Sequence, residues 1–375
     1  MRTWITAEWL SRTGGSERVV EHLAAVLPDA RVFSPVVFAG AAPTIDPARI
    51  HAAFRRPERL MEKRQVAALM NAAVWPAWGR GLDRRADLVV ASHHLASQWT
   101  SVYSDVPHVS YVHTPARYAW FPEIDDRASR GPARLVAAHI RRMDRKAARR
   151  VVSYAANSEA TRQRIQQVWD RDARVIHPPI DLQRFHGVVS QEPEPFLLGL
   201  SRFIPYKRLD FAIDVADAAG LPLKLVGGGA LEPELRAKAA EAGVEVTFLT
   251  GLSDAEVAQV MADASALVYP ALEDFGLVPV EAMAAGTPVL ALNHAGTAET
   301  VVHGVTGFLF DDVSDPREWA ARVPDLPTLR AQDCRDRADQ FSPAAFASAV
   351  TTWTAEALQG AVSRPSAPGP RSPGH

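Results

Sequence analysis

The 375-residue chain has a single cysteine, Cys334, and no apolar run near the roughly 20 residues that a membrane-spanning helix needs. One cysteine excludes an internal disulfide and suits a reducing cytoplasm. The first residues, MRTWITAEWLSRTGG, hold an acidic residue and a glycine pair where a secretion signal needs a continuous apolar core. We therefore expect a cytoplasmic protein, either soluble or peripheral to the inner face of the plasma membrane.

The chain also lacks a large net charge, since its formal sum is −2. This value hides an asymmetry. Residues 1–182 carry 27 Lys and Arg against 18 Asp and Glu, a net +9, whereas the remainder carries 14 against 25, a net −11. At 375 residues the chain also exceeds the roughly 250 residues that one hydrophobic core usually supports. Two domains of different charge are expected.

Short apolar runs alternate with helix-length amphipathic segments in both halves. The runs span residues 3–8, 86–92 and 108–113 in the first half, and 196–201, 223–229, 244–250, 265–271, 287–292 and 306–310 in the second. Apolar runs between helices indicate strands that are buried on both faces of a parallel sheet. The predicted fold class is α/β, with two Rossmann-like, doubly wound domains.

The join between the domains is expected in VIHPPIDLQRFHGVVSQEPEP, where prolines cluster and the periodicity lapses. This gives an N-terminal domain of residues 1–182 and a C-terminal domain of residues 183–342. A further helix is expected over about 343–360. Residues 361–375 are rich in proline, serine and glycine, and we expect them to be disordered.

The segment EDFGLVPVEAMAAG places Glu273 and Glu281 on either side of a glycine and an apolar stretch. On one continuous helix, the two carboxylates would point about 80° apart. Gly276 and Pro279 argue against a continuous helix, because glycine permits a sharp turn and proline prefers the first helical turn. The pattern predicts a helix that begins between Leu277 and Pro279. Glu273 would then lie in the preceding loop and Glu281 on the first turn, both facing that helix end.

Polar residues follow several expected strands, which is where ligands bind to doubly wound sheets. Gly14 and Gly15 precede Ser16, a predicted N-cap, and form a turn at a helix N-terminus that can hold an anion. An ordinary tight turn is the alternative. His113 ends the run HVSYVH, where a catalytic or a structural histidine would fit.

Two cations, Arg202 and Lys207, follow the run FLLGLS. Cations that converge at one strand end suit a diphosphate, because they neutralise a leaving group without donating a proton. Solvated loop side chains are the alternative.

Three motifs are interpreted as having no such chemistry. The sequence DRD at 170–172 is a known metal-binding pattern, but it lies between a helix and a strand and is interpreted as a solvated turn. His93 and His94 are adjacent and point in different directions, and no partner pair at ligand spacing accompanies them, so no zinc site is expected. No P-loop is found, and Gly227–Gly229 is a weak version of a dinucleotide fingerprint.

Eight segments carry a resemblance to one enzyme family: GGSERVVEHLAAVLPDA, YVHTPARYAWF, AANSEATRQRI, VIHPPIDLQRF, LSRFIPYKRLD, LVGGG, VTFLTGLSDAEV and the stretch from Glu273 to Phe310. Through them the chain resembles, nearly end to end, the GT-B glycosyltransferases of family 4, which are retaining enzymes with nucleotide-sugar donors. The Glu-x7-Glu spacing is the most specific feature. VHTPARYAW and VIHPPID look most like bacterial mannosyltransferases of O-antigen and related surface glycans. Pro178 and Pro179 stand where many relatives have Asn-Gly, so hinge details are not carried over.

The resemblance implies two domains that face each other across a cleft, with the donor held largely by the C-terminal domain. Glu273 would hydrogen-bond the donor sugar and Glu281 the ribose. The backbone amides of Phe275 to Val278 would contact the sugar and phosphates. Arg202 and Lys207 would hold the diphosphate and stabilise its developing charge.

The resemblance also implies that Gly14 and Gly15 form a loop over the diphosphate and that His113 lies near the reacting face of the sugar. No enzyme nucleophile is seen for the opposite face. The implied reaction is therefore a same-face displacement in which the leaving phosphate takes the acceptor's proton. No cofactor and no obligatory metal are expected. The last helix would cross back to the N-terminal domain, and closure on the donor would exclude water.

The resemblance also bears on the donor and the acceptor. We expect GDP-mannose as the donor and a glycan or a polyprenyl- or lipid-linked acceptor, with no nucleic-acid partner. A UDP-sugar is the main alternative, with a base pocket expected near Gly251 to Ser253. An epimerase, a phosphorylase of the same fold and a silent sugar-binding subunit are further alternatives. The joint presence of both cations and both glutamates argues against the silent subunit.

A basic helix is predicted within RLVAAHIRRMDRKAARR, residues 134–150. Its apolar stripe comprises Val136, Ile140, Met143 and Ala147, and its two basic rows are Arg141, Arg145, Arg149 and Arg142, Lys146, Arg150. A second basic segment, FRRPERLMEKR, precedes an apolar stretch that ends in Trp75 and Trp78. With the net +9, these features predict docking of the N-terminal domain on an anionic membrane. In the alternative, the stripe packs on the sheet and the arginines are solvated.

Overall fold

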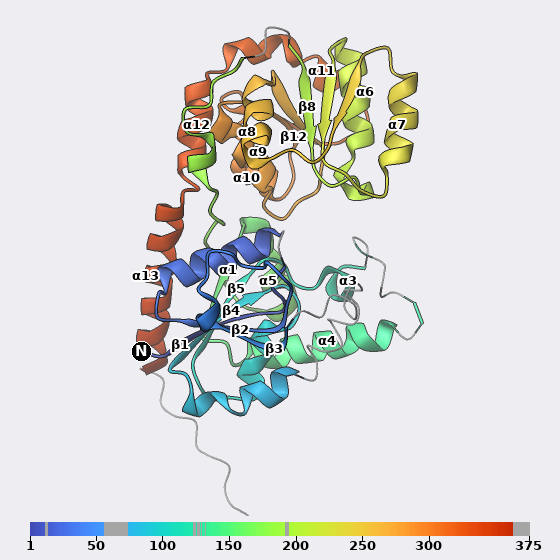
Figure 1. The fold of residues 1–375 in the computed structure, drawn as a ribbon. Helices are drawn as coiled ribbons and strands as arrows, with labels where there is room; N and C mark the ends of the chain where they lie inside the picture. The colour runs from blue at the N-terminus through green and yellow to red at the C-terminus, as the bar shows by residue number, and fades with distance from the viewer. Residues whose placement is uncertain are drawn as a thin grey trace, which may run out of the picture. The chain divides into compact units, whose positions relative to one another are not determined.

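The computed structural model describes residues 1–362, except 12–13, 56–73, 123–124, 126–127, 129, 132 and 192–194. The chain forms two compact units, each built on one parallel sheet (Figure 1). Unit 1 comprises Met1–Asn157, Thr161–Ile176 and the chain from Ala347 on, and unit 2 comprises Ser158–Ala160 and His177–Phe346. The prediction of an α/β fold with two Rossmann-like sheets is confirmed.

Unit 1 has a seven-stranded sheet in the order β3-β2-β1-β4-β5-β6-β7. The strands are β1 (Thr3–Ala7), β2 (Arg31–Val37), β3 (Ile50–Arg55), β4 (Leu88–His93), β5 (His108–Val112), β6 (Ser153–Ala156) and β7 (Arg174–Val175). Strand β1 lies inside the sheet between β2 and β4, and its Ile5 pairs in parallel with Val32 of β2 and Val90 of β4. Its five residues are all buried, as a strand covered on both faces requires.

The helices of unit 1 and its aromatic residues enclose this sheet. They include α1 (Gly15–Val26), α3 (Arg117–Trp120), α4 (Ala133–Ala148) and α5 (Glu159–Trp169), with 3-10 helices η1 (Pro47–Arg49), η2 (Leu82–Arg84) and η3 (Ser97–Val102). Trp78 stacks on Phe33 at 4.0 Å and meets Trp4 edge-on at 5.3 Å, and Trp75 is fully buried beside them. Trp75 and Trp78 are therefore core residues, and the expectation that they form part of a membrane-docking surface is wrong.

Unit 2 has a six-stranded parallel sheet in the order β10-β9-β8-β11-β12-β13. Its strands are β8 (Leu197–Leu200), β9 (Leu223–Val226), β10 (Val246–Leu249), β11 (Ala266–Tyr269), β12 (Val289–Leu292) and β13 (Gly307–Phe310), and each falls inside one of the six predicted runs. The helices are α6 (Leu209–Ala219), α7 (Glu232–Glu241), α8 (Asp254–Asp263), α9 (Leu277–Ala285), α10 (Gly296–Thr300), α11 (Pro316–Ala320) and α12 (Ala331–Asp339), with η5 (Leu182–Phe185), η6 (Pro205–Lys207) and η7 (Val323–Thr328). Separate apolar clusters lie on the two faces of this sheet, one under α8, α9 and α12 and the other under α6 and α11.

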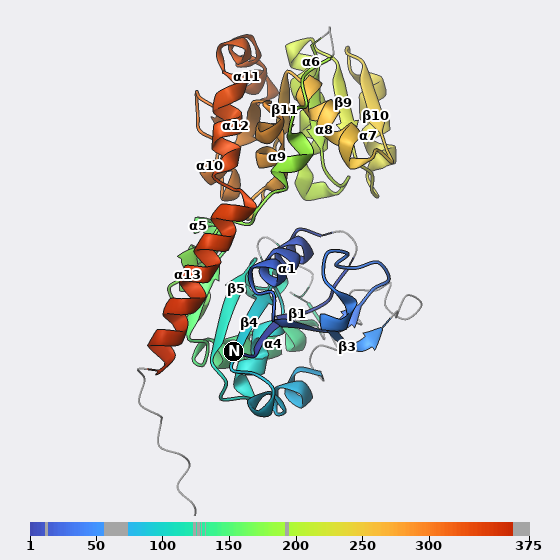
Figure 2. The ribbon, with the colours of Figure 1, turned by 60° about the vertical axis from the view of Figure 1, so that its left-hand side comes forward.

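The last helix, α13 (Pro343–Val362), takes part in both units (Figure 2). Residues up to Phe346 group with unit 2 and those from Ala347 with unit 1. Within unit 1, the indole Nε1 of Trp353 donates to Ser153 Oγ at 2.9 Å, and Glu356 pairs with Arg174 at 2.6 Å. The helix continues through Val362, so its last two residues overlap the tail that was expected to be disordered. The rest of that prediction, 363–375, lies outside the described residues.

Candidate active site

The sheet order of unit 2 creates one point where the chain changes direction across the sheet. From β8 the chain proceeds outward to β9 and β10, and it then returns to β11 and proceeds the other way to β12 and β13. The loops after β8 and β11 therefore diverge and leave a crevice at the carboxyl ends of the two strands, which is where doubly wound sheets bind ligands. Arg202 and Lys207 follow β8, and Glu273 follows β11. The fold thus brings three of the predicted site residues to one place.

The cation Lys207 is buried at this point and is bonded to groups from the neighbouring strand. Its Nζ donates to Glu273 Oε1 and, at 3.3 Å, to Tyr269 Oη. Burial raises the pKa of Tyr269 well above its usual value, and the Glu273 charge adds to this shift, so the phenol stays neutral. Arg202 has a more open environment, with its guanidinium donating to Tyr206 Oη at 3.0 Å. A diphosphate bound here would share Lys207 with Glu273.

The glycine triplet after β9 holds the Arg202 segment in place. A Cβ on Gly227 would lie 2.0 Å from the carbonyl oxygen of Ser201, and one on Gly229 would lie 2.6 Å from that of Phe203. The amide of Phe203 donates to the carbonyl of Gly228 at 2.9 Å. The triplet was compared with a dinucleotide fingerprint in the sequence, but its observed role is to let two strand-end loops approach closely.

Helix α9 begins at Leu277, within the predicted range, and its N-terminus opens on the same crevice. Gly276 stands before it with φ 82°, a conformation that favours glycine, and has no side chain to cap the helix. The first amides of α9 can therefore serve an anion. A Cβ on Gly296 would lie 2.1 Å from Cα of Phe275, and the amide of Gly296 donates to the carbonyl of Glu273 at 3.1 Å. Gly296 supports the backbone from Glu273 to Phe275, and sequence reasoning did not single it out.

Glu281 is the fifth residue of α9, so the prediction that it lies on the first turn is wrong by one residue. Proline takes the third helical position here, and the helix begins at the early end of the predicted range. The Glu281 side chain is 12% exposed, and the Arg184 guanidinium lies 3.6 Å from its carboxylate. Arg184 also pairs with Asp254 at 3.2 Å. Arg184 of η5 thus links Glu281 to Asp254 of α8, while the Glu281 charge, like that of Glu273, acts on Tyr269.

In unit 1 the chain reverses direction between β1 and β4, so the corresponding crevice lies at the ends of these strands. Gly14 is the N-cap of α1 and Gly15 its first residue. The prediction that Ser16 caps the helix is wrong, because Ser16 lies inside it and its Oγ donates to Glu17 Oε2 at 2.7 Å. A Cβ on Gly14 would lie 2.1 Å from that same oxygen. The Glu17 carboxylate is therefore folded over the glycine turn.

His113 lies immediately after β5, at the carboxyl edge of the unit 1 sheet, as predicted. Its Nε2 lies 2.8 Å from Ser92 Oγ, and its ring is 5.3 Å from Tyr111 and 6.2 Å from His94. Near it lies a carboxylate that sequence reasoning missed, Glu8 after β1. Glu8 and His94 both follow strand ends, so the rule that selected His113 could have found them.

The two motifs considered for metal binding have other surroundings. The side chain of Asp172 is 72% exposed and pairs with Arg162 at 2.8 Å, which is the solvated turn expected of this segment. His93 is fully buried, and its ring lies 5.6 Å from Trp169. Within the part of the chain that the structure describes, no three His, Cys, Asp or Glu side chains are grouped so as to hold a metal ion.

Helix α4 packs on unit 1 through Ala137, Ile140, Met143 and Ala147. Val136 is 45% exposed, so its inclusion in the buried stripe is wrong, and Ala137 takes that place. The buried Asp144 accepts bonds from the indoles of Trp99, at 2.7 Å, and Trp120, at 2.8 Å. The apolar face of α4 is thus occupied by the unit itself.

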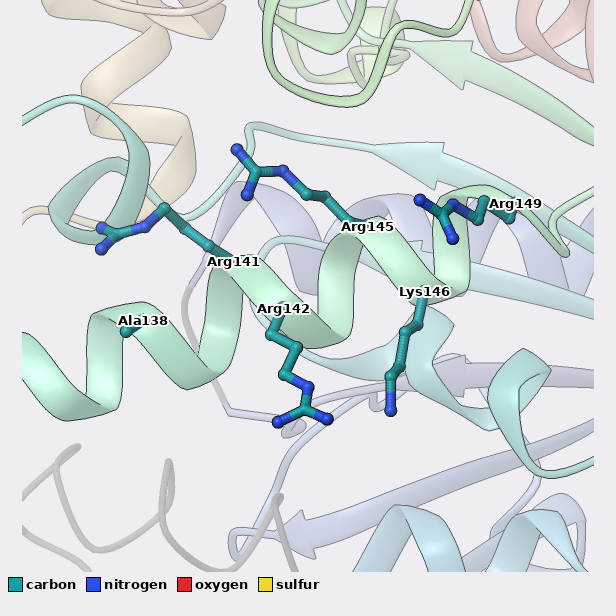
Figure 3. A pocket seen from close by; sticks show the side chains of 6 residues that line it. All are labelled: Ala138, Arg141, Arg142, Arg145, Lys146 and Arg149. Atoms are coloured by element: carbon teal, nitrogen blue, oxygen red, sulfur yellow. The ribbon is translucent and has the colours of Figure 1, made fainter.

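The opposite face of α4 is basic (Figure 3). Arg141, Arg142, Arg145, Lys146 and Arg149 line a shallow hollow of about 410 Å³. In Figure 3, Arg142 and Lys146 extend to one side of the helix, and Arg141 and Arg145 to the other. The Arg141 guanidinium donates to the carbonyl of Ala119 at 2.6 Å, and Arg145 lies over the Trp120 ring at 5.0 Å. The second basic segment, FRRPERLMEKR, lies outside the described residues from its third residue on.

Family models match both halves of the chain. The model for Glycosyltransferase Family 4 matches residues 13–184, and the model for Glycosyl transferases group 1 matches residues 183–344. The chain therefore belongs to the family 4 glycosyltransferases, and its two sheets form the GT-B fold.

Curated relatives and solved structures agree with this assignment. The D-inositol 3-phosphate glycosyltransferase of Streptomyces scabiei is 27% identical over 366 residues, which are 86% of this chain and 81% of that protein. The human alpha-1,3/1,6-mannosyltransferase ALG2 is 28% identical over 221 residues, and the match spans about half the length of each protein.

Two solved structures share the fold over nearly the whole chain. HepE from Anabaena, in complex with UDP and glucose, has a TM-score of 0.68 and 23% identity, with 95% of this chain and 99% of that chain covered. The sucrose-phosphate synthase of Thermosynechococcus elongatus has a TM-score of 0.72 and 17% identity, with 96% and 100% covered.

Proposed function

We propose that this glycosyltransferase is retaining and transfers mannose from GDP-mannose to a glycan or lipid-linked acceptor in the synthesis of cell-envelope polysaccharide or glycolipid. The observation that carries the donor half of the proposal is the convergence of Arg202, Lys207 and Glu273 at the switch point of the unit 2 sheet. Arg202 and Lys207 supply positive charge for the diphosphate. Glu273, in the loop before the N-terminus of α9, supplies a carboxylate for the sugar. Glu281 and the amides of Phe275 to Val278 complete this set.

The chemistry follows from where charge develops in the reaction. As the bond from the sugar C1 to the phosphate oxygen breaks, positive charge grows on the sugar and negative charge on the diphosphate. Arg202, Lys207 and the α9 amides stabilise the latter charge. The acceptor oxygen forms its bond to C1 on the same face, and its proton passes to the leaving phosphate. His113 and the turn at Gly14 and Gly15 would bind the sugar and the phosphates from unit 1.

The stereochemistry tests the reaction type. With GDP-α-mannose, the proton NMR spectrum of the product is expected to show an α-linked mannose. A β-linked product would replace this mechanism with an inverting one.

The donor assignment rests on the likeness of the sequence to mannosyltransferases, among them ALG2. The competing nucleotide is UDP, with which HepE was solved. Competition binding of GDP against UDP, measured by displacement of a fluorescent nucleotide, decides between them. We expect GDP to bind at least tenfold more tightly. Tighter binding of UDP would reassign the donor, and binding of a donor without any turnover would favour a silent sugar-binding subunit.

Docking on an anionic membrane is a further part of the proposal. In the structure, however, the apolar stripe of α4 is not available for it. The apolar face of α4 is buried, so attachment through this helix would depend on its exposed cations, among them Arg142, Lys146 and Arg149. Each basic residue near an anionic surface contributes on the order of 1 kcal/mol, so attachment should be weak and sensitive to salt. The described helices include none that is long and apolar enough to cross a bilayer.

Sedimentation with vesicles tests the docking. We expect binding to phosphatidylglycerol vesicles at low salt, no binding to phosphatidylcholine vesicles, and loss of binding in Arg142→Glu/Lys146→Glu. The control Arg236→Glu/Arg322→Glu makes the same change of net charge at exposed pairs of unit 2 and should bind like the wild type. Absence of binding at low salt would favour a soluble acceptor.

A further inference from the structure

A buried carboxylate and an imidazole meet at the switch point of the unit 1 sheet. Glu8 follows β1 and His94 follows β4, and these two strands are neighbours on either side of the reversal. Ligands of doubly wound sheets bind at such points. The proposed function so far assigns these two residues no role.

Glu8 is fully buried, and one of its oxygens is bonded to the loop after β4. Oε1 accepts the amides of Leu95 at 3.0 Å and of Ala96 and Ser97 at 2.8 Å, as well as that of His94 at 3.2 Å. Burial alone would raise the pKa of Glu8, but the His94 and His93 imidazoles and the Ser97 amide hold that pKa well below its usual range. Glu8 is therefore a carboxylate at neutral pH, and it fixes the start of this loop.

The second oxygen of Glu8 is directed at the His94 ring. Oε2 lies 3.2 Å from His94 Nδ1. The two atoms are not aligned as a hydrogen bond, but a carboxylate charge so close to Nδ1 favours a proton on that nitrogen and, in the neutral imidazole, a lone pair on Nε2. Trp9 packs edge-on against the ring at 4.4 Å. Both the tautomer and the orientation of the imidazole are thus restrained.

The outer edge of His94 is accessible. The side chain of His94 is 21% exposed and its Nδ1 is buried, so the exposed part of the ring lies away from Nδ1. The neighbouring His113 differs, because its Nε2 already lies 2.8 Å from Ser92 Oγ. His94 therefore presents a hydrogen-bond acceptor at the crevice of unit 1.

We infer that His94 Nε2 accepts a hydrogen bond from a hydroxyl group of the acceptor sugar, and that Glu8 is the positioning residue that holds His94 in this state. The inference rests on the proposed function, because it names the group of unit 1 that meets the acceptor. The contact transfers no proton. It orients the acceptor, whose reacting hydroxyl still gives its proton to the leaving phosphate.

The tautomer of His94 is measured by long-range ¹H–¹⁵N NMR of protein labelled at histidine, with His94→Asn used to assign the signal. We expect the proton on Nδ1 in the wild type. In Glu8→Gln, the amide oxygen can still accept the loop amides, but the amide nitrogen now donates to Nδ1, so the proton should move to Nε2. A proton on Nε2 in the wild type, or no change in Glu8→Gln, would overturn the positioning role.

Binding of the hydroxyl is tested with methyl α-D-mannopyranoside, methyl β-D-galactopyranoside and methyl N-acetyl-β-D-glucosaminide, each with and without GDP. We expect at least one of them to shift the His94 Nε2 signal. Its affinity should fall about tenfold or more in Glu8→Gln and in His94→Asn, which keeps a donor towards Glu8 but has no group at the Nε2 position. His94→Gln, whose amide reaches that position, should retain more affinity. His139→Asn, at an exposed position of α4, is the matched control and should bind like the wild type.

A His94 signal that none of the three glycosides shifts would overturn the hydroxyl contact. In transfer assays, His94→Asn should raise KM for the acceptor more than it lowers kcat. Nucleotide binding separates this inference from the proposed function. If GDP and UDP both fail to stabilise the wild type against heat while a glycoside still shifts His94, the donor assignment fails and the hydroxyl site stands. If a nucleotide binds and no glycoside shifts the His94 signal, the hydroxyl site fails and the donor assignment stands.

Discussion

At the scale of single residues, the two cations of the proposed donor site have different surroundings. Lys207 is buried between Glu273 and Tyr269, whereas Arg202 contacts the exposed Tyr206. Removing one preorganised contact to a developing charge costs about 3 to 4 kcal/mol, or two to three powers of ten in rate. We expect Arg202→Ala and Lys207→Ala each to lose turnover by this amount, measured as kcat with saturating donor.

The same two variants should differ in stability. Lys207→Ala leaves the Glu273 carboxylate without its buried partner, so its melting temperature should fall, while that of Arg202→Ala should stay near the wild-type value. A variant that keeps near-native turnover would remove that residue from the mechanism. Equal melting temperatures would show that the lysine pair has no structural role.

The charge state of Glu8 predicts how stability depends on pH. Its pKa in the folded protein lies well below the ordinary value of 4.5. A depressed folded pKa gives stability that is present above the unfolded pKa and is lost as the pH falls towards the folded one. The difference in unfolding free energy between wild type and Glu8→Gln should therefore be larger at pH 7 than at pH 4. Tryptophan fluorescence during urea unfolding measures it well, because every tryptophan except Trp319 belongs to unit 1. A difference that is the same at both pH values would contradict the assigned charge.

At the scale of elements, the glycine triplet after β9 offers a comparison between adjacent positions. A Cβ at Gly227, where φ is 138°, would lie 2.0 Å from the carbonyl oxygen of Ser201, but a Cβ at Gly228 would meet nothing within 4 Å. Gly227→Ala should therefore displace the Arg202 loop and weaken GDP binding tenfold or more, while Gly228→Ala should bind GDP like the wild type. Isothermal titration with GDP checks both. Equal affinities would mean that the loop tolerates the displacement.

The elements show what sequence patterns can and cannot predict. All six strands of unit 2 were predicted, because each is a short apolar run between amphipathic helices. Strands β2, β3 and β6 were missed: β2 contains a serine and a proline, β3 a histidine, and β6 has four residues, two of them alanine. Their burial comes from neighbours that a local pattern does not show.

The residues of the candidate site likewise divide into those that the sequence predicted and those that it did not. Arg202, Lys207, Glu273 and His113 were found because they follow strand ends and are polar. Gly296 was missed because its function is the close approach of the backbone at Phe275, which is distant in sequence. His94 was considered as a metal ligand and set aside, since its partner Glu8 is 86 residues away and becomes its neighbour when β1 pairs with β4.

At the scale of the whole molecule, Cys334 reports on the opening of unit 2. It is the single cysteine of the chain, and burial raises the pKa of its thiol to about 12. Its helix, α12, packs against α9, whose N-terminus belongs to the proposed donor site. A ligand at 100 times its Kd stabilises the bound form by about 2.7 kcal/mol, which corresponds to about 100-fold.

We therefore expect alkylation of Cys334 by iodoacetamide to be slow in the native protein and about 100-fold slower with GDP at that concentration. Mass spectrometry of the labelled protein over time measures the rate. The control is the same reaction in urea, where GDP should have no effect. A rate that GDP leaves unchanged in the native protein would show that the nucleotide does not stabilise the packing around α12.

The position of α13 in the chain bears on how the protein is made. Unit 2 is nearly continuous in sequence, from His177 to Phe346. Unit 1 instead takes Trp353 and Glu356 against Ser153 and Arg174, strand residues that leave the ribosome about 200 residues earlier. During translation, the first half of the polypeptide must therefore wait, with the β6 and β7 edge of its sheet uncovered, until synthesis has passed through the whole second half. The domain that is begun first is thus the last to be completed, and this edge is where a nascent chain would most need protection from aggregation.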